Sequence, residues 1–123
     1  MTAFGALIGE SLRPGATIEP ADFRATRIVR CESGDESAGQ PRWWTFIEFE
    51  VADEQATVLA DALAEALRPD GGWYCDFHTD AESYVVFADR IFRYPRGDAS
   101  GRAAAATYAR SVGVPEHQVD WSV

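Results

Sequence analysis

The segment from Gly71 to Asp98 constrains the fold more than any other part of the chain. It reads GGWYCDFHTDAESYVVFADRIFRYPRGD and predicts three short strands, at about 73–78, 83–87 and 90–94. Short turns separate these runs, which is typical of antiparallel pairing. Upstream, residues 24–32 and the alternating run 43–51 (WWTFIEFEV) predict a further hairpin. The chain is therefore expected to build an antiparallel sheet.

Two helices are expected around these strands. Residues 54–68 carry apolar side chains at helical spacing, and residues 101–112 follow a capping Asp98 or Ser100. The order is ββαβββα, and residues 3–9 are either one more strand or a helical turn. We expect an α+β fold in which a single antiparallel sheet carries both helices on one face. At 123 residues, the chain 1–123 is expected to be one domain.

The sheet face opposite the helices is expected to be open and rich in aromatic residues. Side chains alternate along a strand, so Trp73, Cys75 and Phe77 belong inside while their neighbours point outward. Residues 83–87 do not decide which of their side chains face outward. The predicted ligand-binding residues on this face are Trp44, Glu48, Tyr74, Asp76, His78, Arg90, Phe92 and Tyr94. An aromatic patch with convergent polar groups indicates a ligand site or an interface. The alternatives are a homodimer contact or cover by the first 20 residues.

Asp76 and His78 are the candidate catalytic residues, because they fall on one strand face. With Glu48 or Arg90 across the sheet they could form an acid–base group; the alternative is a surface salt-bridge cluster. Cys75 with His78 is a weaker nucleophile–base candidate, since a core-facing cysteine ordinarily acts as a small hydrophobe.

No cofactor or metal is expected. Two His and two Cys at wide spacing match no zinc pattern, and the phosphate-binding glycine motifs are missing from the sequence. The arginines at positions 90, 93, 96 and 102 either hold an anion or pair with the acidic excess.

The net charge of −9 disfavours nucleic acid and anionic membranes as partners. It suits a basic protein or a cationic small molecule. All eleven basic residues are Arg, so lysine Schiff-base chemistry is excluded. No signal peptide or membrane span is recognisable, and we expect a cytoplasmic protein with Cys31 and Cys75 as free thiols.

Several motifs resemble those of a group of small uncharacterised proteins from high-GC bacteria. They are GWYCDF, YVVFADRIFRYPRGD and GVPEHQVDW, with GESLRPG and TFIEFEV upstream. The resemblance covers nearly the whole chain. It implies a stand-alone domain and assigns no role to any residue.

Three functions remain as hypotheses. The first is a binding protein whose open face takes a small molecule or a protein partner, including immunity-like capture of a basic toxin. The second is a small enzyme performing isomerisation or hydrolysis with Asp76 and His78. The third is a homo-oligomer in which the aromatic face lies between chains.

Overall fold

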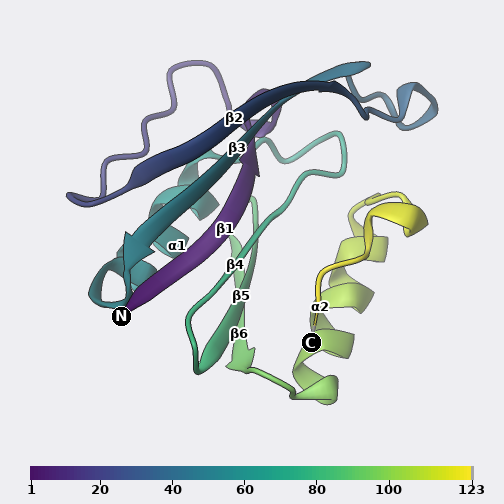
Figure 1. Ribbon diagram of the computed structural model, residues 1–123. Helices are drawn as coiled ribbons and strands as arrows, with labels where there is room; N and C mark the ends of the chain where they lie inside the picture. Colours follow the sequence, from purple (N-terminus) through teal and green to yellow (C-terminus); the bar gives the residue numbers. More distant parts are fainter. Residues whose placement is uncertain (123) are drawn as a thin grey trace.

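The computed structural model describes residues 1–122, which form one six-stranded antiparallel sheet with two helices. The strand order is β2-β3-β1-β4-β5-β6 (Figure 1). The strands are β1 (Thr2–Ile8), β2 (Arg24–Glu32), β3 (Trp43–Ala52), β4 (Cys75–His78), β5 (Glu82–Phe87) and β6 (Arg90–Pro95). The helices are α1 (Ala56–Ala66) and α2 (Ala99–Ser111). The α+β class and the single antiparallel sheet are confirmed, and residues 3–8 belong to a strand, while Gly9 begins a 3₁₀ turn.

Strand β1 lies in the centre of the sheet and joins its two halves. It pairs with β3 along its whole length and with β4 from Phe4 to Ala6. Gly5 allows this close packing, because a Cβ there would lie 2.5 Å from the Cβ of Phe77 and 2.9 Å from the ring of Phe49. Those two rings pack edge to face, with centroids 6.2 Å apart.

Helix α1 covers one face of the sheet. Its Leu59 and Leu63 are fully buried, as is Leu67 just beyond its end. They pack in one cluster with Phe49, Phe77 and other inward residues of β1, β3, β4 and β5. The spacing of these leucines is the apolar stripe that predicted the helix.

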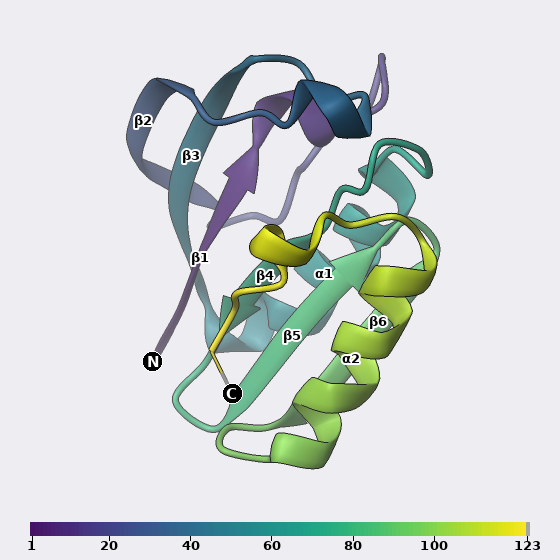
Figure 2. The same cartoon turned by 90° about the vertical axis from the view of Figure 1, so that its right-hand side faces the viewer.

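Helix α2 covers the opposite face, so the expectation that both helices share one face is wrong. Val85 and Phe87 of β5 pack with Ala105 and Ala109 of α2, whereas their neighbours on β5 pack toward α1. Figure 2 shows α2 in front of β5 and β6, with α1 behind the sheet. The physical reason is that β5 is apolar on both faces, a pattern that a strand buried on two sides requires.

The segment after α2 turns back over the sheet. It passes through a short 3₁₀ turn, Glu116–Gln118, and its Trp121 is buried in the α2 cluster. Arg102 of α2 fixes the segment by donating to the carbonyl oxygens of Val119 and Trp121, at 3.1 and 3.2 Å. The segment thereby crosses toward the end of β4 (Figure 2). Within residues 1–122, neither helix has the length and apolar character of a membrane span.

Candidate functional site

A cavity of about 270 Å³ opens on the sheet face opposite α1, between β3 and the C-terminal segment. This volume equals the space of about nine water molecules in the liquid, enough for a small metabolite. We call it the aromatic–acidic cavity. Its lining residues are Ala6, Ile8, Trp44, Phe46, Gly72, Trp73, Tyr74, Asp76, Gln118 and Asp120.

The floor of the cavity exists because a small residue occupies the central strand. Ala6 of β1 pairs with Glu48 of β3 on one side and with Asp76 of β4 on the other. Directly paired residues point to the same face of the sheet. Two longer side chains therefore flank a single methyl group, and a hollow remains above Ala6.

Aromatic side chains form the walls. Trp44 and Trp73 meet at 5.3 Å between ring centroids with a 55° interplanar angle, so the two indoles form a corner. Trp73 precedes β4 and is buried. The indole N–H of Trp44 is buried and has no acceptor among residues 1–122.

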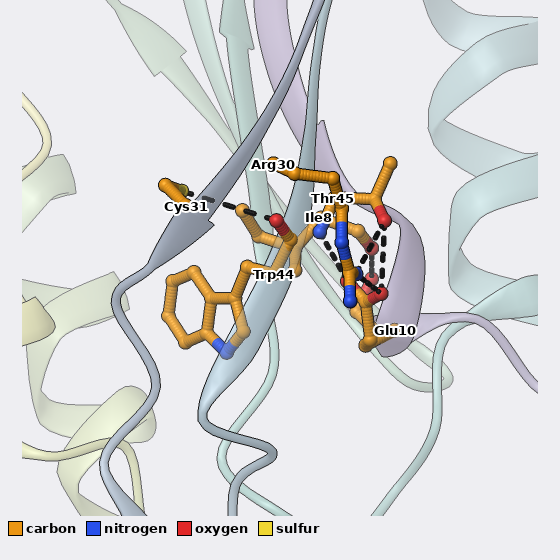
Figure 3. A network of polar contacts seen from close by, with 7 residues as sticks. Ile8, Glu10, Arg30, Cys31, Trp44 and Thr45 are labelled. Atoms are coloured by element: carbon orange, nitrogen blue, oxygen red, sulfur yellow. Dashed lines mark hydrogen bonds and ion pairs between the residues drawn. The ribbon is translucent and has the colours of Figure 1, made fainter.

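A polar network next to Trp44 fixes this part of β3 (Figure 3). The Glu10 carboxylate accepts hydrogen bonds from the Thr45 backbone N–H at 2.5 Å and from Arg30 at 2.8 Å. Burial raises the pKa of Glu10, but the hydrogen bonds from Thr45 and the charge of Arg30 outweigh it and leave that pKa below its ordinary value. The network ties the turn after β1 to β2 and β3, next to the position of Trp44 on β3.

Two carboxylates and a phenol occupy the opposite side of the cavity. Burial, followed by repulsion from Asp120, raises the pKa of Asp76 to about 6. Among residues 1–122, the only hydrogen bond that favours the Asp76 charge comes from its own backbone N–H. Tyr74 donates from its hydroxyl to the carbonyl of Gln118 at 2.5 Å and lies 3.2 Å from Asp120 Oδ1. Burial and the charge of Asp76 raise the pKa of Tyr74 well above its ordinary value.

The C-terminal segment closes one end of the cavity through paired amides. The side chains of Gln40 and Gln118 exchange hydrogen bonds of 3.0 and 2.8 Å. Gln40 also donates to the carbonyl of Gly71 at 3.0 Å, and Asp35 donates its backbone N–H to Gln40 at 3.1 Å. These bonds hold the loop between β2 and β3 against the C-terminal segment.

The structure brings three of the predicted ligand-binding residues together, namely Trp44, Tyr74 and Asp76. Glu48 shares their face but lies outside the cavity lining, 3.4 Å from Arg27. His78 also shares the face and lies beside Phe4, 6.4 Å away between ring centroids.

The candidate pair Asp76 and His78 does not form a hydrogen-bonded dyad among the described residues. Burial lowers the pKa of His78, the charge of Arg96 lowers it further, and the charge of Asp80 opposes the change. The pKa of Asp76 is instead raised by burial and then by the charge of Asp120. The two groups therefore titrate in separate surroundings.

The other three predicted residues lie under or beside α2. Tyr94 is buried, and its hydroxyl accepts a hydrogen bond from the Trp121 indole at 3.1 Å. Phe92 packs on Tyr108 of α2, with ring centroids 5.5 Å apart. Arg90 lies over both of these rings, 4.8 and 5.2 Å from their centroids. This half of the face was expected to be open, and α2 covers it.

Cys75 faces the α1 core, as the alternation predicts. It is buried, its thiol lies 3.3 Å from the carbonyl of Ala6, and burial raises its pKa well above the ordinary value. His78 points to the opposite face, so the pair cannot act as nucleophile and base. Cys31 also lies on the opposite face, in register with Trp44, and both thiols are free. Residues 1–122 hold no cluster of three potential metal ligands.

Sequence reasoning missed Ala6, Trp73, Gln118 and Asp120. Trp73 was assigned to the inner face, but it precedes β4, where strand alternation does not hold. Asp120 and Gln118 reach the cavity only through the return of the C-terminal segment, which local pattern does not predict. Comparison with protein-family models, curated proteins and solved structures finds no match to the chain.

Proposed function

We propose that this chain is a small-molecule-binding protein whose ligand occupies the aromatic–acidic cavity. The observation that carries the proposal is a cavity on the sheet that is lined by four aromatic side chains and two carboxylates. Binding sites typically combine apolar walls with a few convergent polar groups in this way. We also propose that the protein is cytoplasmic, a compartment with which the free thiols of Cys31 and Cys75 are consistent.

Two neighbouring tryptophans provide a matched test. Trp44 lines the cavity, whereas Trp43 points to the other face of β3 and is 48 % exposed. We expect native mass spectrometry of gently purified protein to show retained small-molecule mass. Trp44→Leu should lose it and Trp43→Leu should keep it. Equal retention in both variants would contradict the proposal, and a retained protein chain would favour the immunity-like or homodimeric hypotheses.

Acid–base catalysis is a second candidate function, and the pKa of Asp76 supports it. A carboxyl group with a pKa of about 6 inside a cavity can exchange protons near neutral pH. Asp76 would be the base, with Tyr74 or Asp120 positioning the substrate. The test is a pH–rate profile on small carbonyl and ester substrates. Turnover with an inflection near pH 6 that Asp76→Asn abolishes would favour this function, and equal turnover in that variant would exclude it.

A further inference from the structure

We infer that the group bound in the aromatic–acidic cavity is an organic cation, an alkylammonium or guanidinium head carrying apolar carbon. The inference rests on the proposed function and names the ligand class of the same site. Three observations support it: the charge of the lining, the unpaired state of Asp76, and the aromatic walls of the cavity.

The charge of the lining has one sign. The ten lining residues include Asp76 and Asp120 but neither Arg nor His. The nearest acidic neighbour in the same row of the sheet, Glu48, is already paired with Arg27. An anionic ligand would meet two like charges, one of them on the largely buried Asp76, which costs free energy.

Asp76 lacks a counter-charge in the described part of the molecule. Its carboxylate is largely removed from water, is repelled by Asp120, and receives no hydrogen bond from another residue. A neutral apolar ligand would remove the remaining water and leave this charge unpaired, which is unfavourable. A cation between the two carboxylates would offset both the desolvation and the repulsion.

The aromatic walls favour the same chemistry. Cations bind over the faces of aromatic rings, and tryptophan is the strongest partner. Elsewhere in the molecule arginines already occupy such positions: Arg90 lies over Phe92 and Tyr108, and Arg102 lies 5.1 Å from the Trp121 ring centroid. Within residues 1–122, neither Trp44 nor Trp73 has a cation over its ring. The cavity thus has the walls of a cation site without an internal occupant.

The test titrates isotope-labelled protein at pH 7.5 with four probes and follows the indole N–H signals by NMR. The probes are tetramethylammonium, n-butylammonium, the neutral 3,3-dimethylbutan-1-ol and the anion butyrate. Trp44 and Trp73 report on the cavity, and Trp43, on the other face of β3, serves as an internal control. We expect the cations to shift the cavity signals with at least about tenfold higher affinity than the neutral alcohol, and butyrate to have no effect.

Charge variants sharpen the test. Asp76→Asn and Asp120→Asn should each weaken cation binding by about tenfold or more. The matched control Asp80→Asn removes an exposed charge outside the cavity and should leave binding unchanged. Equal affinity for the cation and its neutral analogue would overturn the inference while leaving the proposed binding function intact. No shift of the cavity signals by any probe would count against both.

The cation could belong to a free amine or to a side chain of a partner. The blocked amino acid Nα-acetyl-lysine-N-methylamide distinguishes these sources. Binding of n-butylammonium at least about tenfold more tightly than this blocked lysine assigns the cavity to a free amine. The reverse order assigns it to a lysine of another protein.

Discussion

The sheet face opposite α1 has two halves that carry similar aromatic residues but differ in what covers them. The half on β5 and β6 carries Phe87, Phe92 and Tyr94 and is sealed by α2. The half on β1, β3 and the start of β4 carries Trp44, Phe46 and Tyr74 and surrounds a cavity. Aromatic alternation is common to both, so it does not by itself distinguish a binding surface from a core.

The difference lies in what approaches each half. Helix α2 presents alanines at 105, 106 and 109, all buried, and Gly101 lies directly against Tyr94. Small residues let the helix axis come close and exclude water. Over the other half, the C-terminal segment contributes polar side chains, Gln118 and Asp120, which leave space. A closely packed helix produces a core, whereas a segment that contributes polar side chains leaves a cavity.

The largest expected effect is on the free energy of unfolding, which should fall more for a substitution in the half covered by α2 than for one in the half around the cavity. Tyr94→Ala should lower the free energy of unfolding by about 3–5 kcal/mol, because it empties a buried site and removes the acceptor of the Trp121 indole. Phe46→Ala, in the half-buried wall of the cavity, should cost about 1–2 kcal/mol. Urea denaturation of both variants measures the contrast. Equal losses would mean that the two halves do not differ as described.

Gly101→Ala tests the close approach of α2. In an exposed helix this change gains about 1 kcal/mol from helix propensity. Here the new Cβ would lie 2.4 Å from the Cβ of Tyr94, so we expect a loss of about 1–3 kcal/mol. The matched control is Ala103→Gly on the exposed side of α2, which should cost about 1 kcal/mol from propensity alone. A stabilised Gly101→Ala protein would show that α2 packs less tightly.

Asp76→Asn tests the electrostatics of the cavity half. The pKa of Asp76 rises on folding from 3.8 to about 6, so the protonated carboxyl favours the folded state. That contribution is complete below about pH 4 and is lost as the pH rises through 6. Above pH 6 the ionised group should therefore lower stability by about 1–2 kcal/mol, allowing for partial solvent screening.

Unfolding free energies measured from pH 4 to 8 check this expectation. Asp76→Asn should be more stable than the parent protein at pH 8 and similar to it at pH 4. The exposed control Asp80→Asn should show no gain that develops across pH 6. Parallel profiles for Asp76→Asn and the parent would contradict a raised pKa.

The smallest expected effect concerns the C-terminal segment. Tyr74→Phe removes the hydroxyl that donates to Gln118 and should cost about 1 kcal/mol. Amide hydrogen exchange of residues 115–122 should accelerate, because this bond helps hold the segment over the cavity. Tyr108→Phe is the control, since no hydrogen bond from its hydroxyl occurs among the described residues. Equal amide exchange rates in both variants would show that the Tyr74 hydroxyl does not hold the C-terminal segment.

Local pattern predicted the strands and part of the site for physical reasons. Alternation along β3 and β4 is strict, so Trp44 and Asp76 were placed on one face and Cys75 on the other. The run Tyr84–Phe87 is apolar on both faces, so alternation there has no polar side to orient the helices. That ambiguity produced the wrong side for α2. Asp120 joins the site through a contact with Tyr74 that spans 46 residues, and such contacts depend on the whole fold.

The central position of β1 governs the order in which the strands of the sheet can pair during folding. Its partners are Phe46–Ala52 and Asp76–His78, so β1 is synthesised before both and pairs only after they follow. Until residue 78 leaves the ribosome, one edge of β1 remains an unpaired template. Pairings this distant in sequence are slow to form because long loops must close first. The two halves of the sheet thus depend kinetically on a strand whose second partner lies about 70 residues along the chain.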